Sequence, residues 1–311
     1  MSERLPIVNV VSISGGKDSQ AAANVCVERC GNQDIRLLFC DTGNEHPLTL
    51  EHINYLAGAL GREIVILRAT FDREIARKRE YVLSVWPTEG VPDAICQRAA
   101  AALVPSGNPF LDLCLWKGRF PSRRAQFCTQ ELKRRVIDAY MLDRLATGAE
   151  VWSWQGTRRD ESANRTHLVE RELCAEGWWI ERPVVDWTAK QAVDYCLSKG
   201  QRLNPLYGEG FDRVGCAPCI NSGKDDVLNW QRRHPEVIER IMEWEFLVAE
   251  ASKRGAASFF PAPDKDGRGA RQGRNIIDYV EWSKTSRGGV QYDLIKAIPV
   301  HGCTSSYGLC E

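Results

Sequence analysis

Short apolar runs alternate with longer amphipathic segments along the N-terminal part of the chain. The apolar runs are rich in β-branched residues and predict strands, at 7–13, 35–40 and 64–67. Between them, apolar residues at helical spacing predict helices at 19–29 and 47–60, the second one closed by Gly61. Strands that alternate with helices predict an α/β fold with a doubly wound parallel sheet, whose ligand lies at the carboxyl ends of the strands.

The regular pattern stops between Trp86 and Phe127, where prolines and glycines interrupt it. Such a stretch predicts an insertion or a lid over the sheet rather than a second domain. Further elements are predicted beyond it: helices at 129–145, 188–198, 224–232 and 235–253, a strand at 151–154 and an extended stretch at 180–185. We therefore expect a sheet-containing domain at 1–200, with an insertion at 86–127, and a smaller, mainly helical, cysteine-containing region at 201–311.

Composition excludes several classes of protein. A hydrophobic content of 43% in 311 residues supports a packed core and excludes general disorder. The first apolar run is too short for a signal peptide or a membrane span, so we expect a cytoplasmic protein without membrane contact. The 41 basic and 41 acidic residues cancel, so a nucleic-acid partner would need a local basic patch. In a reducing compartment the twelve cysteines are expected to be buried thiols or metal ligands, not disulfides.

The segment 14–19, Ser-Gly-Gly-Lys-Asp-Ser, connects the first predicted strand to the first predicted helix. Its glycines allow close backbone approach, and the free amides of a helix N-terminus together with Lys17 suit a polyphosphate. Ser14 and Ser19 offer hydroxyl donors, and Asp18 could help to hold Mg²⁺. An ordinary strand-to-helix turn is the alternative, but six contiguous residues in this context favour a phosphate loop.

Two further polar segments follow predicted strands: Asp41, Thr42 and Gly43 after the second strand, and Gly156, Arg158, Glu161 and Arg165 after the strand at 151–154. Guanidinium groups bind phosphate bidentately, so the two arginines are suitable phosphate ligands that the glutamate could hold in place. A solvated charged loop is the alternative. The position directly after a strand favours a ligand site.

Together these segments resemble the PP-loop ATP pyrophosphatase superfamily, in the branch of phosphoadenylylsulfate reductases, the ATP sulfurylase small subunit and the DNA phosphorothioation pyrophosphatase. Asp186-Trp187-Thr188 and Asn204-Pro205-Leu206-Tyr207 also match. The resemblance implies an adenine nucleotide α-hydrolase-like fold that binds ATP and Mg²⁺. The residues it places at the nucleotide are Ser14, Gly15, Gly16, Lys17, Asp18, Ser19, Asp41, Thr42, Gly43, Gly156, Arg158, Glu161 and Arg165. Lys17, Asp18 and Arg158 are the expected catalytic residues.

Cys216 and Cys219 form a Cys-x-x-Cys motif, and Cys128 begins the segment Cys-Thr-Gln-Glu-Leu-Lys. The pattern is similar to that of assimilatory adenylylsulfate reductases, in which a tandem cysteine pair and a Cys-x-x-Cys motif hold a [4Fe-4S] cluster. Here a threonine replaces the second tandem cysteine. The fourth ligand is then Cys310 or Cys303, or the fourth iron is open to sulfide or substrate. Thiolates suit Zn²⁺ as well, and thiols without a metal are the remaining interpretation.

The resemblance leaves three functions open. The first is an ATP pyrophosphatase that adenylates an acceptor for sulfur transfer, with a sulfur donor such as a cysteine desulfurase as partner; the retained Lys17 and Asp18 favour it. The second is a sulfonucleotide reductase that releases sulfite, with Cys310 or Cys303 as nucleophile and thioredoxin as reductant. The third is a non-catalytic nucleotide-binding iron–sulfur module of a larger complex.

A basic segment around Cys128 bears on the acceptor. Its members are Lys117, Arg119, Arg123, Arg124, Lys133, Arg134 and Arg135. Such a segment could follow the phosphate backbone of DNA or tRNA, with Trp116 and Phe120 available for stacking. A solvated helix face with a basic lid is an equal alternative.

Overall fold

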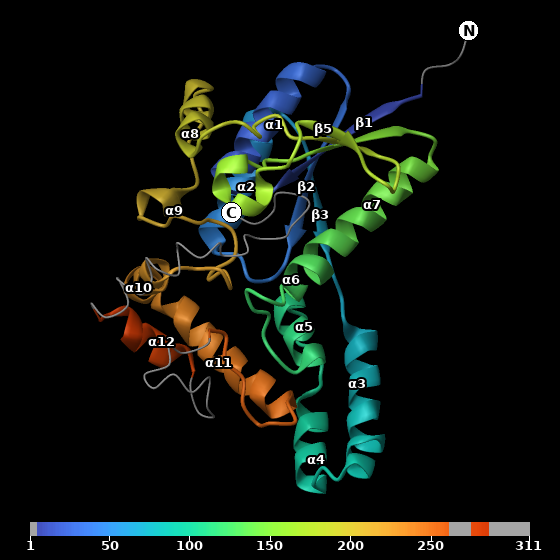
Figure 1. Cartoon of the computed structure of the whole chain (residues 1–311), viewed down its shortest axis with the longest axis vertical. Coiled ribbons are helices and arrows are strands. Elements are labelled where there is room, and N and C mark those ends of the chain that lie inside the picture. The colour runs from blue at the N-terminus through green and yellow to red at the C-terminus, as the bar shows by residue number, and fades with distance from the viewer. Residues whose placement is uncertain (1–4, 261–274, 286–311) are drawn as a thin grey trace.

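The computed structural model describes residues 5–260 and 275–285. Its described strands form one six-stranded sheet in the order β3-β2-β1-β4-β6-β5 (Figure 1). The strands are β1 (Ile7–Ile13), β2 (Asp34–Asp41), β3 (Ile64–Arg68), β4 (Glu150–Trp154), β5 (Arg171–Leu173) and β6 (Trp179–Glu181). Neighbouring strands are parallel except β5, which runs antiparallel to β6. The predicted α/β class with a doubly wound parallel sheet is confirmed, and the sheet is antiparallel only at the β5 edge, where a short turn returns the chain directly.

Helices cover both faces of the sheet, as a doubly wound fold requires. They are α1 (Lys17–Cys30), α2 (Pro47–Leu60), α7 (Arg135–Ala146) and α8 (Ala189–Ser198). Val10 of β1 shares a core with Met141 of α7. The next residue, Val11, points to the opposite face and shares a core with Cys26 of α1 and Ile53 of α2. This alternation follows from the two-residue period of a strand.

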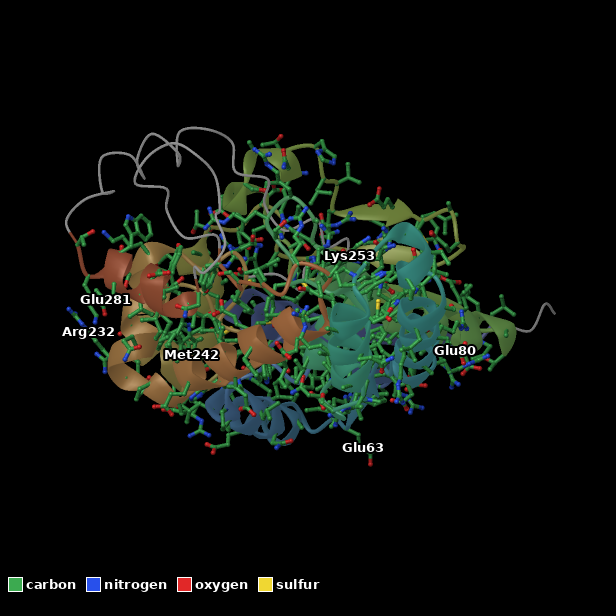
Figure 2. All side chains as sticks on the ribbon, turned by 90° about the horizontal axis from the view of Figure 1, so that it is seen from below. Glu63, Glu80, Arg232, Met242, Lys253 and Glu281 are labelled. Carbon is green, nitrogen blue, oxygen red and sulfur yellow. The ribbon has the colours of Figure 1, made fainter. Side chains whose placement is uncertain are left out.

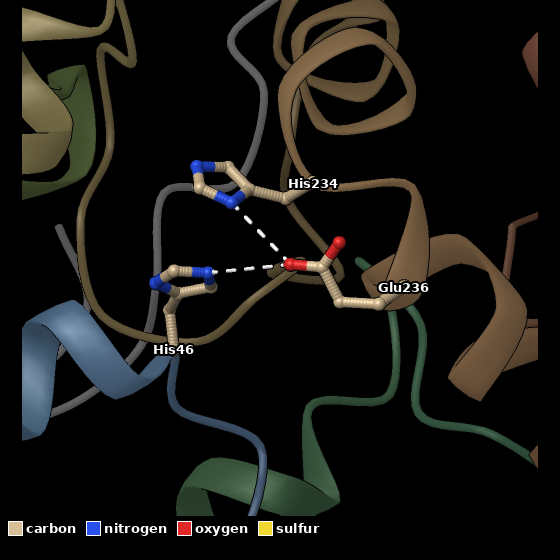
Figure 3. A group of neighbouring side chains, drawn as sticks. All are labelled: His46, His234 and Glu236. Carbon is tan, nitrogen blue, oxygen red and sulfur yellow. Dashed lines mark ion pairs between the residues drawn. The ribbon is translucent and has the colours of Figure 1, made fainter.

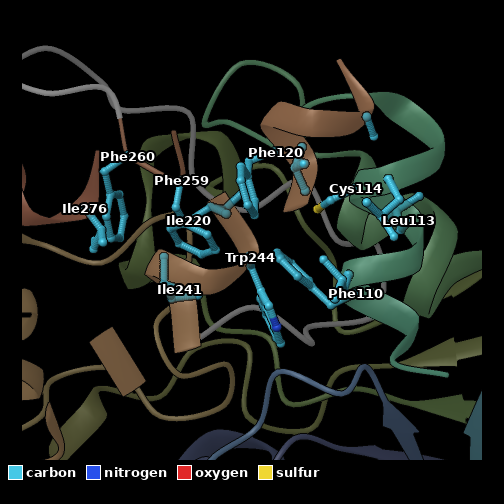
Figure 4. Packing of buried hydrophobic residues seen from close by; sticks show 14 of the residues in the cluster. Phe110, Leu113, Cys114, Phe120, Ile220, Ile241, Trp244, Phe259, Phe260 and Ile276 are labelled. Carbon is cyan, nitrogen blue, oxygen red and sulfur yellow. The ribbon is translucent and has the colours of Figure 1, made fainter. Parts of the chain in front are cut away.

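Six further helices form a second layer beside the carboxyl edge of the sheet (Figure 1). They are α3 (Asp72–Ser84), α4 (Asp93–Ala102), α5 (Pro109–Lys117), α10 (Lys224–Arg233), α11 (Pro235–Ala251) and α12 (Ile276–Ser283). Their core is aromatic: the ring of Phe110 lies 5.6 Å from that of Trp244 and 5.9 Å from that of Phe259 (Figure 4). Charged side chains such as Glu80 and Glu281 lie at the periphery (Figure 2). None of the helices in the described ranges has the length and apolar character that crossing a membrane requires.

Two of these helices fall in the stretch for which the sequence predicts no regular structure. α5 is buried from Pro109 to Leu115, so apolar residues lie on every side of it, around the buried Asp112, and it shows no amphipathic period. α4 and α5 pack against α11 in the helical layer instead of lying as a lid over the sheet.

Candidate functional site

Three polar loops meet at one edge of the sheet. β1 lies between β2 and β4, and all three strands are parallel, so the loops that follow them emerge at the same carboxyl edge. The chain order of the strands reverses between β1 and β4. In open α/β sheets such a reversal is where ligands bind. The predicted phosphate loop after β1 and the Gly156 segment after β4 flank this point.

The two serines of the phosphate loop are bonded within the loop. The Oγ of Ser19 accepts a hydrogen bond from the amide of Ser14 at 3.1 Å and donates one to the carbonyl of Gly16 at 3.0 Å. The Oγ atoms of Ser14 and Ser19 also lie 3.1 Å apart. Gly15 has a φ of +84°, which a residue with a side chain rarely adopts. These contacts fix the shape of the loop at the start of α1.

A segment far along the chain supports the phosphate loop. Asn204, the N-cap of the short helix α9 (Pro205–Gly208), donates from Nδ2 to the carbonyl of Gly15 at 3.2 Å. The hydroxyl of Tyr207 accepts a hydrogen bond from the amide of Lys17 at 3.1 Å. The Nζ of Lys17 also lies 5.2 Å from the centre of the Tyr207 ring. The Asn-Pro-Leu-Tyr segment therefore positions the backbone and the side chain of this lysine.

Asp18 forms a buried ion pair. Its Oδ1 lies 2.7 Å from the Nε of Arg158, and both side chains are almost completely buried. The Nζ of Lys17 lies 3.7 Å from the other carboxylate oxygen, and Arg158 also pairs with Asp160. Breaking a buried pair by removing one partner costs about 3–5 kcal/mol, so a magnesium ion on Asp18 would have to replace a strong contact. The structure therefore places Asp18 against Arg158, and the expected role of Asp18 in holding Mg²⁺ stays a prediction.

Gly156 allows the loop after β4 to lie against the start of α1. A Cβ on this residue would lie 2.5 Å from backbone atoms of Asp18 and Ser19. Further along, Arg165 is buried and pairs with Glu161, whose carboxylate also accepts from the amide of Arg158 at 3.4 Å. The glutamate thus holds the side chain of Arg165 as expected, but it contacts only the backbone of Arg158, whose side chain pairs with Asp18 and Asp160.

The loop after β2 is organised by Glu45. Its carboxylate accepts from the hydroxyl of Thr42 at 2.6 Å and from the amide of Thr42 at 3.1 Å. Burial raises the pKa of Glu45, while the hydrogen bond from Thr42 and the charge of Lys133 oppose that rise. Asp41 accepts from the amide of Gly43 at 2.9 Å and lies 3.4 Å from Arg68.

A clamp joins this loop to the Cys-x-x-Cys segment. The carbonyl of Asn44 accepts from the amide of Ala217 at 2.6 Å, and its side chain donates to the carbonyl of Pro218 at 3.0 Å. Arg240 of α11 donates to the side chain of Asn44 at 3.1 Å and to the carbonyl of Ala217. Arg240 carries no local motif that could have revealed this role.

Cys128, Cys216 and Cys219 line one cavity of about 40 Å³, together with Thr42 and Lys133. Burial raises the pKa of Cys128 to about 11 and that of Cys216 to about 12, and Lys133 partly offsets both shifts. Burial alone would lower the pKa of Lys133, but the nearby Cys216 and Glu45 outweigh it, so that pKa is raised. This lysine therefore serves as a cation beside the thiols.

That position changes the interpretation of the basic segment, because Lys133 belongs to the cavity and not to an exposed basic patch. Lys117 and Arg135 both pair with Glu131, at 3.3 and 2.5 Å. These pairs reduce the charge available to a nucleic acid. Arg119 and Arg124 remain exposed.

The structure brings the three cysteines predicted to bind a metal to one cavity, and whether they hold a cluster or a zinc ion stays a prediction. Thiolates that share one zinc lie about 3.8 Å apart, since tetrahedral zinc–sulfur bonds are about 2.3 Å long. In the part of the chain that the structure describes, the group with all ligand atoms within 4.8 Å of one another is His46, His234 and Glu236, not the cysteines. Cys303 and Cys310, the two candidates for the fourth ligand, lie outside the described residues.

Fold and site together define a PP-loop α/β protein of the phosphoadenylylsulfate reductase-like branch. Residues 8–222 match the phosphoadenosine phosphosulfate reductase domain, and the chain belongs to this family.

The chain is also similar to individual proteins. The chain is 40% identical to the uncharacterized 37.8 kDa protein in the gpa 5′ region of Escherichia phage 186, over 98% of this chain and 97% of that protein. It is 36% identical to the adenosine 5′-phosphosulfate reductase of Neisseria meningitidis serogroup A, over 35% of this chain and 46% of the enzyme. Among solved structures, the phosphate complex of phosphoadenylyl-sulfate reductase from Candida auris is similar, with a TM-score of 0.40 and 14% identity over 67% of this chain and 80% of that one.

Proposed function

We propose that the chain is an ATP pyrophosphatase that adenylates an acceptor for sulfur transfer. One observation carries the proposal: Thr42, at the nucleotide edge of the sheet, lines the same cavity as the three cysteines. Glu45 from the same loop pairs with Cys216 in an isolated β-bridge. An activated group bound at the loops would therefore lie beside the thiol cavity.

The reaction divides into two displacements. An acceptor oxygen attacks the α-phosphorus of ATP, the bond to the bridging oxygen breaks, and pyrophosphate leaves with that electron pair. A sulfur nucleophile then displaces AMP from the acceptor. Lys17 and Arg158 would stabilise the negative charge that builds on the phosphates, and Asp18 would orient Arg158.

The donor set fits an iron–sulfur cluster held by Cys128, Cys216 and Cys219, with Cys310 or Cys303 as the fourth ligand, or with an open fourth iron; Zn²⁺ is the alternative. When bound with an open iron, a [4Fe-4S] cluster supplies a site for sulfide or a substrate atom. Lys133 would offset the negative charge of the thiolates, since it lines the same cavity.

DNA or tRNA is the proposed acceptor, and a cysteine desulfurase the proposed sulfur donor. Arg119 and Arg124 are exposed and support a nucleic-acid partner, whereas the exposed Arg134 and Arg135 pair with Asp138 and Glu131. Arg123 is a weaker candidate, because its guanidinium donates to the carbonyl of Ser222 at 3.2 Å. Replacing Arg119 and Arg124 with alanine should weaken nucleic-acid binding and flatten its salt dependence. Unchanged binding would exclude this surface.

The test of the enzyme uses anaerobic protein, Mg²⁺ and ATP labelled at the α- and γ-phosphates, with tRNA, DNA or no acceptor. Lys17→Ala is the test variant, and Lys190→Ala, a lysine that is 81% exposed on α8, is the matched control. AMP and pyrophosphate from the wild type and the control, but not from Lys17→Ala, are expected. Equal product from Lys17→Ala would refute the assigned role of this lysine.

A sulfonucleotide reductase is the second candidate, favoured by the similarity to the adenosine 5′-phosphosulfate reductase of Neisseria meningitidis. It predicts sulfite release from an adenylylsulfate in the presence of thioredoxin and no AMP from ATP. Binding of ATP without turnover of either substrate would instead indicate the non-catalytic module.

A further inference from the structure

Three side chains from separate elements converge outside the thiol cavity. His46 is the N-cap of α2, His234 lies between α10 and α11, and Glu236 is in the first turn of α11. The Nδ1 of His234 lies 3.4 Å from the Oε1 of Glu236, and the Nε2 of His46 lies 3.9 Å from the same oxygen (Figure 3). The ligand atoms of the three residues all lie within 4.8 Å of one another.

The other nitrogen of His234 determines which atom faces the group. Its Nε2 lies 2.6 Å from the carboxylate of Glu209, an acceptor, so this nitrogen carries a proton. In the neutral ring, Nδ1 then presents a lone pair to the carboxylate of Glu236. Two acceptors that face each other repel unless a proton or a metal ion lies between them. A carboxylate behind a histidine is also the usual support of a histidine that binds a metal.

We propose that His46, His234 and Glu236 bind a divalent first-row transition-metal ion of the zinc type. Two imidazoles and one carboxylate suit such an ion, whereas Ca²⁺ and Mg²⁺ prefer oxygen ligands alone. Ligands bound at about 2.0–2.1 Å to one ion lie roughly 3–3.5 Å apart, so His234 and Glu236 already have the required spacing. The Nε2 of His46, now 3.9 Å from Glu236, needs to approach that carboxylate by about half an ångström.

Binding has one identifiable cost, at His46. Its Nδ1 accepts a hydrogen bond from the amide of Leu48 at 3.3 Å, so the ring proton is on Nε2 in that arrangement. A metal on Nε2 requires the proton on Nδ1 and removes this bond. Losing one long hydrogen bond of this kind lowers the affinity by about tenfold at most. The amide of Thr49 still bonds the His46 carbonyl at 2.8 Å, so the helix start is retained.

The site would join the two layers of the molecule. His46 directly follows Glu45, which organises the loop at the nucleotide edge, while Glu236 and Arg240 lie one turn apart on α11. An ion here would hold the start of α11, and with it the clamp on the Cys-x-x-Cys segment, against the loop after β2. This structural role is independent of the proposed enzyme activity.

The test uses Co²⁺ alone as the probe, added to the metal-free full chain with its thiols kept reduced. Cobalt bound by thiolates gives intense near-ultraviolet charge-transfer bands, whereas cobalt bound by nitrogen and oxygen does not. Glu236→Gln is the principal variant, because this side chain is 63% exposed and its replacement leaves the core intact. Glu239→Gln, an exposed carboxylate on the same helix, is the matched control.

We expect the wild type, Glu239→Gln and Cys219→Ser each to bind one Co²⁺ equivalent that gives no thiolate bands, in addition to any cobalt that binds at the thiol cavity. Its affinity should fall at least about 100-fold in Glu236→Gln and in His234→Asn, and by about 10- to 100-fold in Glu209→Gln. The thermal midpoint should rise with Co²⁺ in the wild type and not in Glu236→Gln. The proposal is overturned if the wild type binds cobalt through thiolates only, or if Glu236→Gln binds it like the wild type.

Discussion

Replacing Gly156 with alanine tests how closely the loop after β4 must approach the phosphate loop. The added Cβ would lie 2.5 Å from the carbonyl carbon and oxygen of Asp18 and from the amide nitrogen of Ser19. Favourable contacts between such atoms are about 3.5–4.0 Å, so the two backbone segments must separate by roughly 1 Å. The φ of Gly156 is not in the left-handed region, so the effect comes from this contact and not from backbone strain.

Overpacking of this kind typically costs about 1–3 kcal/mol, and the upper half of that range applies because backbone lies on both sides of the contact. Unfolding entropy is about 2.1 cal/mol/K per residue, or roughly 0.65 kcal/mol/K for 311 residues. The thermal midpoint should therefore fall by about 3–5 °C. The displaced peptide, Asp18–Ser19, lies in the first turn of α1, at the proposed phosphate site. The affinity for ATP should therefore fall at least about tenfold.

Scanning calorimetry measures the first effect and titration calorimetry with ATP the second. Gly58→Ala is the matched control, since Gly58 lies within α2 and its added Cβ would meet no atom within 4 Å. That control should be neutral or more stable by up to about 1 kcal/mol, because alanine favours a helix. A Gly156→Ala protein with the thermal midpoint and ATP affinity of the wild type would refute the reasoning.

Three other substitutions test the contacts that hold the fold. Thr188→Ala removes the cap of α8 and should lower the free energy of unfolding in urea by about 1 kcal/mol; no change would mean that the cap is redundant. Arg240→Met keeps most of the packing volume but leaves Asn44 without its donor, and should cost about 1–3 kcal/mol by the same measurement. Burial raises the pKa of Glu245 in the folded state, so the unfolded chain loses this proton first and the free energy of unfolding declines as the pH rises through the raised pKa. Glu245→Gln should reduce that decline and should also destabilise the protein, since Ile276 loses an acceptor at 2.8 Å; an unchanged pH profile would exclude Glu245 as its source.

Local signals in the sequence were sufficient for several elements. The strand Ile7–Ile13 and the helix Pro47–Leu60 have the predicted bounds, and Gly61 ends the helix with a φ of +59°. Thr188 caps α8 as predicted, because its hydroxyl accepts from the amide of Gln191. Such features depend on neighbours within one helical turn or one strand, so the chain itself specifies them.

Contacts between distant segments could not be predicted in this way. α5 shows no amphipathic period because it is buried on both sides. β5 is antiparallel to β6 because a short turn connects the two strands directly. Lys133 belongs to a run of basic residues in the sequence, but the fold places it in the thiol cavity.

The sequence by itself determined the α/β class, and it singled out residues 14–19 as a candidate phosphate loop and three cysteines as candidate metal ligands, because each depends on residue type and local spacing. Only the tertiary structure decided that Asp18 pairs with Arg158, that Arg240 clamps the Cys-x-x-Cys segment, and that His46 meets His234. These partners are separated by long stretches of chain. Their proximity results from the packing of the sheet against the helical layer, and local periodicity carries no record of that packing.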